Sequence, residues 1–96
     1  MYGLITRLTA YPGRRDELAL LLMDPAVRKH GCHSYIVAHD LVDADVLWVT
    51  EVWADQPTHL SWSEDLRQSG AWRPIYGLMA KMDDSIMTRP LGGLGL

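Results

Sequence analysis

The chain has 96 residues, 48% of them hydrophobic, which suits one compact domain that still exposes a large share of its surface. Nine basic and twelve acidic side chains give a formal net charge of −3, and the basic residues are scattered along the chain. Nucleic acid and anionic membrane are therefore poor partner classes.

The start of the chain and its cysteine bear on where the protein works. The opening residues MYGLITRLTAYPG alternate and include an early arginine, so we expect no signal peptide. No run approaches the ~20 apolar residues of a membrane helix. The single cysteine, Cys32, can form no disulfide within the chain, which agrees with a reducing compartment. We therefore expect a cytoplasmic protein.

The first quarter of the chain predicts a strand and then a helix. Alternation with a period of two over Tyr2–Thr9 is typical of a strand. Leucines at helical spacing in RRDELALLLM predict the first helix, with acidic residues near its start, where the helix dipole favours them. We expect the helix to break or restart at Asp24 and Pro25 and this region to end at Gly31.

The middle of the chain predicts a β-hairpin that leads into a second helix. Cys32–Ala38 is rich in strand-forming residues, VDAD at 42–45 forms a polar turn, and Asp45–Trp53 is the second arm. A helix is expected from about Asp55 to Gln68.

The last third of the chain predicts more helix, one strand and a tail. After a stop near Gly70, the helix resumes over AWRPIYGLMAK, and Ser85–Arg89 forms a last short strand. The tail PLGGLGL contains too many glycines to hold a shape alone. We therefore expect a single domain over residues 1–90 and a flexible glycine-rich tail over residues 91–96.

The order strand, helix, strand, strand, helix, strand predicts an α+β fold of the ferredoxin-like βαββαβ type with an antiparallel sheet. The third strand is apolar on both faces: Val46, Trp48 and Val52 on one, and Leu47, Val49 and Trp53 on the other. The helices of one subunit can cover only one face, and the other would exceed the apolar patch that monomers usually expose. We therefore expect a homodimer.

One face of the helix over residues 55–68 carries the strongest functional signal. Spacing of 100° per residue turns four side chains toward the sheet: His59, Trp62, Ser63 and Leu66. Because buried polar groups need partners or water, this face predicts a cavity wall, with Trp72 and Tyr76 as further flat surfaces and His59 as a proton donor or acceptor. The alternative is a packed core, in which His59 donates to a backbone carbonyl and Trp62 fills space.

A carboxylate in the third strand is a second candidate. Glu51 and Trp53 lie two residues apart, so both side chains point to the same face of the sheet. A buried carboxylate should be paired, and we expect a structural ion pair with Arg7 or Arg73. A general-base role for Glu51 is the alternative.

Metal and nucleotide sites are not expected. Ligand types that suit zinc or copper gather at His30, Cys32, His33, His39 and Asp40, but a strand through Cys32 and His33 sends these two side chains to opposite faces. The glycines of GGLGL do not open a helix, which excludes a nucleotide-binding loop. We expect no metal and no cofactor.

Four segments follow one another along the chain: LITRLTAYPGRRDEL, GCHSYIV, TEVW with the DQPTHLSW helix after it, and a closing strand before RP. Taken in this order, they resemble the antibiotic biosynthesis monooxygenase family, including its quinol monooxygenase type. The resemblance spans nearly the whole chain and implies a ferredoxin-like domain that dimerises into an α/β barrel. It also implies oxidation of phenolic, quinol or polyketide-like aromatics by O2 without metal or flavin, with the substrate between sheet and helices.

A haem-degrading branch of the family resembles the chain as well. That branch relies on an asparagine, a tryptophan and a histidine, at the places of Thr6, Trp62 and Trp72. Only the tryptophan is present, and an indole has no lone pair to give to iron, so haem degradation is disfavoured.

The function that we predict is a cofactor-independent monooxygenase with His59 as its catalytic residue. The residues expected to bind the substrate are Thr6, Trp62, Ser63, Leu66, Trp72 and Tyr76. Since fold does not carry function, a non-catalytic dimer that binds a small molecule or acts in a stress response is the alternative.

Overall fold

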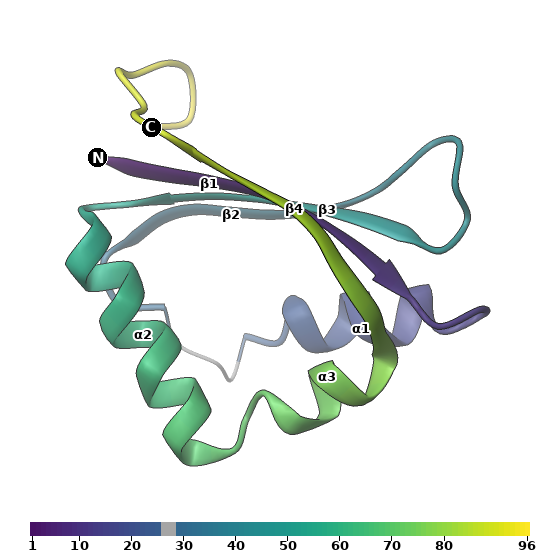
Figure 1. Ribbon diagram of the computed structural model, residues 1–96. Helices are drawn as coiled ribbons and strands as arrows, with labels where there is room; N and C mark the ends of the chain where they lie inside the picture. The colour runs from purple at the N-terminus through teal and green to yellow at the C-terminus, as the bar shows by residue number, and fades with distance from the viewer. Residues whose placement is uncertain (26–28) are drawn as a thin grey trace.

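The computed structural model describes residues 1–25 and 29–96, and over these residues four strands form one antiparallel sheet with the helices on one face (Figure 1). In chain order the elements are β1 Tyr2–Ala10, α1 Arg15–Leu22, β2 Cys32–His39, β3 Val46–Trp53, α2 Gln56–Ser69, α3 Arg73–Leu78 and β4 Met79–Thr88. The strand order is β2-β3-β1-β4, with every neighbouring pair antiparallel. This confirms the predicted ferredoxin-like plan.

The last strand departs most from the prediction. The sequence predicted helix as far as Lys81 and a strand over Ser85–Arg89, whereas α3 ends at Leu78 and β4 runs from Met79 to Thr88. β4 pairs with β1 along its whole length, and this long-range pairing overrides the helical propensity of LMAKM. Two register shifts in the ladder interrupt the alternation of its side chains, so a period of two was hard to read.

The expected break after the first helix is only partly described. α1 ends at Leu22, two residues before Asp24, in agreement with a stop near Pro25. The predicted restart toward Gly31 spans residues 26–28, which lie outside the described residues.

Local signals fix both ends of α2. The side chain of Asp55 caps its N-terminus by accepting a hydrogen bond from the Thr58 backbone N–H at 2.8 Å, and Pro57 occupies the first turn. Gly70 ends the helix in the left-handed conformation at φ 78°. The helix therefore begins and ends within one residue of its predicted bounds.

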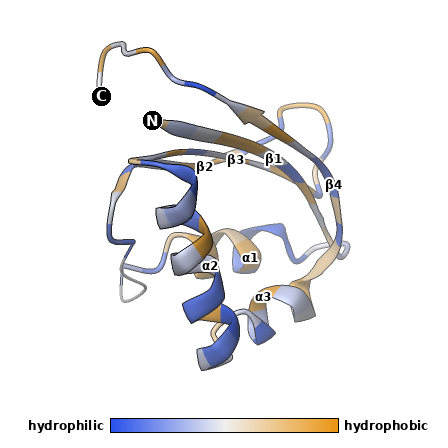
Figure 2. Ribbon diagram, turned by 60° about the vertical axis from the view of Figure 1, so that its left-hand side comes forward, coloured by the Kyte–Doolittle hydropathy of each residue, from blue (hydrophilic) through white to orange (hydrophobic). Residues whose placement is uncertain are grey.

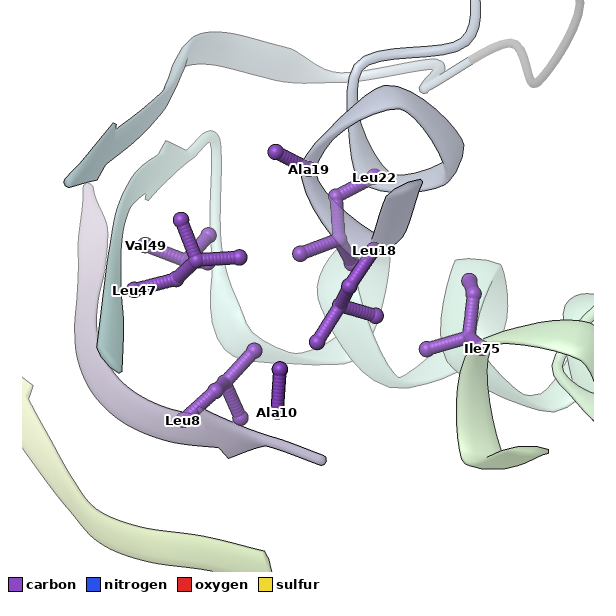
Figure 3. Close-up of a cluster of buried hydrophobic side chains, with 8 residues drawn as sticks. All are labelled: Leu8, Ala10, Leu18, Ala19, Leu22, Leu47, Val49 and Ile75. Atoms are coloured by element: carbon purple, nitrogen blue, oxygen red, sulfur yellow. The ribbon is translucent and has the colours of Figure 1, made fainter. Parts of the chain in front are cut away.

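The hydrophobic core lies under one half of the sheet (Figure 3). Its buried members come from β1, β3, α1 and α3, and are Leu8, Ala10, Leu18, Ala19, Leu22, Leu47, Val49 and Ile75. α2, all of whose residues are described, has no fully buried residue, and Figure 2 shows it as mostly hydrophilic. The sheet is therefore packed tightly against α1 and α3 and loosely against α2.

The face of the sheet away from the helices carries an apolar row. Ile36, Thr50, Ile5 and Ile86 lie directly opposite one another on the four described strands. At the ends of this row, Ile36 is 56% exposed and Ile86 is 54% exposed. Trp48, on the same face, is half-buried and donates to the Asp40 carboxylate at 2.8 Å.

Candidate functional site

A cavity of about 260 Å³ lies between the sheet and the helices α2 and α3. Six of the predicted site residues line it: Thr6, His59, Trp62, Ser63, Trp72 and Tyr76. Leu66 does not line this cavity, and lies instead in a small neighbouring pocket of about 20 Å³ and in an open hollow beside α2. The structure thus gathers residues from a strand, a long helix and a short helix around one space.

Aromatic rings supply the walls, with Trp62 at their centre. Its ring centroid lies 4.9 Å from that of Trp53, 5.9 Å from that of Trp72 and 6.1 Å from that of Tyr35. Trp72 continues the cluster to Tyr76 at 5.9 Å in a stacked arrangement. Tilted and edge-on pairs at these distances are favourable, so the walls are flat, apolar and mutually supported.

Glu51 is a carboxylate in the floor of this cavity. The residue is 6% exposed, and its Oε1 accepts a hydrogen bond from Trp53 Nε1–H at 3.0 Å. The two side chains meet because residues i and i+2 of a strand share a face. Burial raises the pKa of Glu51, and the bond from Trp53 opposes that rise in part.

The predicted ion pair of Glu51 with Arg7 or Arg73 is wrong. Arg7 lies on the opposite face of the sheet, where its guanidinium is 3.0 Å from Asp83. The cause is the alternation of side chains along a strand. Leu4 pairs with Glu51 and shares its face, and Arg7, three residues after Leu4 on the same strand, points to the other face. Arg73 begins α3 beside Gly70, and no ion pair between it and Glu51 is found among the residues that the structure describes.

The titratable neighbour nearest to Glu51 among the contacts of its carboxylate is a histidine. His59 Nε2 is 3.8 Å from Glu51 Oε1, and the His59 side chain is 14% exposed. The imidazole packs against Trp53 at 5.2 Å and Tyr2 at 5.6 Å between ring centroids. Burial lowers the pKa of His59 below its usual value of about 6.5, so the ring is neutral at neutral pH.

Two buried ring nitrogens lack a hydrogen-bond partner in the described part of the chain: His59 Nδ1 and Trp62 Nε1. The packed-core alternative required His59 to donate to a backbone carbonyl, and no such bond is found within residues 1–25 and 29–96. Buried polar atoms without partners are rare, and each calls for an explanation. Both residues line the cavity, so the unpaired atoms concentrate at this one place.

Several members of the site carried no signal in the sequence. Tyr35 enters because the β2–β3 register places it opposite Glu51, and burial raises the pKa of its phenol. The ammonium of Lys29 lies 4.4 Å from the centroid of the Tyr35 ring. Ser85 enters from β4, with its hydroxyl 3.4 Å from that of Thr6. The contacts of Tyr35 and Ser85 depend on strand register, which pairs Tyr35 with Glu51 and Ser85 with Thr6.

The histidines near Cys32 are separated in the structure. His39 pairs with Asp16 at 2.8 Å on the surface, and His33 is exposed. Cys32 donates to the backbone carbonyl of Ser34 at 3.2 Å. Within the described ranges, no group of three or more His, Cys, Asp or Glu side chains is placed to hold a metal ion.

The ferredoxin-like sheet and the aromatic cavity between it and the helices place the chain among small α+β domains. The model of the antibiotic biosynthesis monooxygenase family matches residues 1–71, and the chain belongs to that family. A comparison with curated proteins finds no match.

Solved structures share the fold across nearly the whole chain. A "putative antibiotic biosynthesis monooxygenase" from Chloroflexus aurantiacus is 38% identical with a TM-score of 0.86, over 96% of this chain and 94% of that one. A protein so described from Nitrosomonas europaea is 13% identical with a TM-score of 0.76, over 96% of this chain and 100% of that one. A conserved protein from Methanosarcina mazei is 16% identical with a TM-score of 0.74, over 92% and 90%. The two more distant likenesses concern the fold alone.

None of the helices in the described ranges is long and apolar enough to cross a membrane.

Proposed function

We propose that the protein is a cytoplasmic, cofactor-independent monooxygenase that oxidises a phenolic or quinol-like aromatic with O2 in the cavity under α2. Membership of the monooxygenase family supports the reaction class. The observation that carries the proposal is the neutral, mostly buried His59 beside Glu51 in a cavity with aromatic walls. A volume of about 260 Å³ favours one or two fused rings over a large polyketide.

Removal of a proton starts the proposed reaction. His59 assists the ionisation of the phenol, and the phenolate passes one electron to O2, which yields a phenoxyl radical and superoxide. These combine at a ring carbon to form a peroxide. Loss of water from the peroxide leaves a carbonyl group, so one atom of O2 enters the substrate and the other leaves as water.

The protein's contribution is a shaped, water-poor space. The tryptophan and tyrosine rings hold an aromatic substrate flat and keep water away from the radical pair. Thr6, Ser63 and Ser85 add hydroxyl groups to an otherwise apolar lining, where they can orient the oxygens of the substrate.

We also propose that two copies form a homodimer through the open face of the sheet. Ile36 and Ile86 are more than half exposed there, at the two ends of the apolar row that includes Ile5. Two such faces packed together give the α/β barrel of the family and remove the patch from water. Sedimentation at micromolar concentration should show twice the chain mass, and a monomer that persists on concentration would reject this assembly.

Oxygen uptake tests the proposed reaction. Metal-stripped protein is mixed with a panel of hydroquinones and anthrones, and oxygen consumption is followed with an electrode. We expect consumption that a chelator does not inhibit, and one atom of isotopically labelled O2 in the product. Tight binding of panel members without oxygen uptake would favour the non-catalytic binding protein instead.

A further inference from the structure

His59 and Glu51 face each other across a gap that is too long for a direct hydrogen bond. Nε2 and Oε1 are 3.8 Å apart, whereas N–H···O bonds measure ~2.7–3.2 Å between heavy atoms. Both side chains line the cavity, and Nδ1 of His59 is buried. Nε2 is therefore the ring nitrogen left for a ligand, and a carboxylate oxygen stands next to it.

We propose that this gap holds the hydroxyl group of the substrate, which accepts a hydrogen bond from His59 Nε2–H and donates one to Glu51. An oxygen atom can lie about 2.8 Å from each group if it sits to one side of the line that joins the two atoms. The inference rests on the proposed function and deepens it, because it makes Glu51 a second catalytic residue and the destination of the substrate's proton.

Glu51 is held in place for this role by the strand that carries it. Trp53 Nε1–H donates to Oε1 at 3.0 Å and stabilises the carboxylate in its position. The neighbours on the adjacent strands are Tyr35 on β2 and Leu4 on β1. Of the charged or titratable groups around Glu51, Lys29 is the cation that acts on it, from a distance, and Cys32 and Tyr35 are neutral.

The tautomer of His59 follows from its surroundings. The negative charge of Glu51 attracts the ring proton to Nε2, since the hydrogen bond made by one nitrogen decides which of the two is protonated. Nδ1 then carries only a lone pair in its buried position, and a buried acceptor without a partner is tolerated better than a buried N–H. The ring is thereby a donor toward the gap.

Proton transfer within this arrangement is balanced. The O–H bond of the phenol breaks, the proton bonds to a carboxylate oxygen of Glu51, and the phenolate keeps its hydrogen bond from Nε2–H. The negative charge passes from the carboxylate of Glu51 to the oxygen of the substrate. The buried site therefore never holds two anions at once. Desolvation of Glu51 makes its carboxylate a stronger base, which favours the transfer.

The arrangement selects for a hydroxyl group. A hydroxyl group both accepts and donates a hydrogen bond, whereas an ether or carbonyl oxygen only accepts one. Such an oxygen would face the carboxylate of Glu51 with its lone pairs and make no hydrogen bond to it. The site should therefore bind a phenol in preference to its methyl ether, and a quinol in preference to its quinone. The proposed reaction would thus convert a well-held group into a poorly held one, which helps product release.

Equilibrium binding without oxygen tests this inference. Quenching of tryptophan fluorescence gives the Kd of 2-naphthol and of 2-methoxynaphthalene, which share a ring system and differ in one donor. For the wild-type protein we expect 2-naphthol to bind about tenfold or more tightly, since a buried acceptor left unpaired is costly. Equal binding of the two ligands would overturn the inference without any variant.

Three variants sharpen the test. Glu51→Gln keeps an oxygen acceptor but removes the charge, and should give an intermediate preference. Glu51→Met removes the acceptor, and should bring the preference below about threefold, because a charge-assisted bond is lost. Glu17→Gln on α1, where Glu17 pairs with Arg14 on the surface, is the matched control and should bind as the wild type does. A preference that persists in Glu51→Met would overturn the assignment.

The two proposals fail separately. Hydroxyl preference in a protein that consumes no oxygen would reject the monooxygenase and keep the binding arrangement. Oxygen consumption by a protein that binds both ligands equally would keep the monooxygenase and reject the binding arrangement.

Discussion

The two halves of the helical layer differ in what they bring to the same sheet. At one end, α1 contributes Leu18, Ala19 and Leu22 to a packed core (Figure 3). At the other, α2 has no fully buried residue and presents His59 and Trp62 to a cavity. Burial of apolar area stabilises the first half, whereas the second half keeps open space and unpaired polar atoms. The two halves meet at Leu8, Leu22, Val49 and Ile75, which belong to the core and also line the cavity.

The largest expected effect comes from breaking the packed half. Leu18→Ala removes a fully buried side chain and should lower the free energy of unfolding by about 3 kcal/mol or more, since it leaves a cavity in a well-packed core. Chemical denaturation measures the loss. The folded fraction of this variant should bind 2-naphthol as the wild type does, and a parallel loss of affinity would contradict the separation of the two halves.

The next effect comes from the binding half. His59→Ala should lower turnover about a hundredfold or more, the lower end of general acid–base contributions, with little change in melting temperature. Steady-state rates with any hydroquinone or anthrone that the wild type oxidises provide the measurement. A packed-core role for His59 predicts the opposite ordering, with reduced stability and unchanged activity.

Trp62 tests the wall of the cavity, where binding and stability should change together. Trp62→Ala should mainly weaken ligand binding, because it removes the ring at the centre of the cavity wall, and should also reduce stability by about 3 kcal/mol. Trp62→Phe keeps a flat wall, so its affinity and stability should lie between those of the wild type and of Trp62→Ala. An affinity in Trp62→Ala equal to that of the wild type would remove this side chain from the site.

The smallest effect concerns pH and Glu51. Burial raises the folded-state pKa of Glu51 above its unfolded value of about 4.3, so the folded protein binds this proton more strongly. The resulting stabilisation is present below the unfolded pKa and is lost as the pH rises through the folded pKa. Glu51→Gln removes this loss, so the melting temperature of the variant relative to wild type should rise as the pH increases above about 4. A difference that does not change with pH above this value would contradict the raised pKa.

The fold could be predicted largely because its signals are local. Alternation located β1, β2 and β3 to within one residue, and Asp55, Pro57 and Gly70 marked the ends of α2. β4 could not be read in this way. Its residues 79–82 have helical propensity, and its ladder with β1 contains two register shifts. These residues become a strand because β1 offers an edge to pair with.

The candidate site, too, has features that local periodicity predicts and features that only tertiary packing decides. By themselves, the strand period and the helical period place Glu51 beside Trp53 and His59 beside Trp62, and alternation alone also places Arg7 on the face away from Glu51. Which strand residue lies opposite Glu51, and how near the helix brings His59 to it, depends on ladder register and on the packing of α2 over β3. Periodicity fixes the face on which a side chain lies, whereas the distance between two faces is set by everything that packs between them. The tertiary structure alone therefore decided the 3.8 Å distance between His59 Nε2 and Glu51 Oε1.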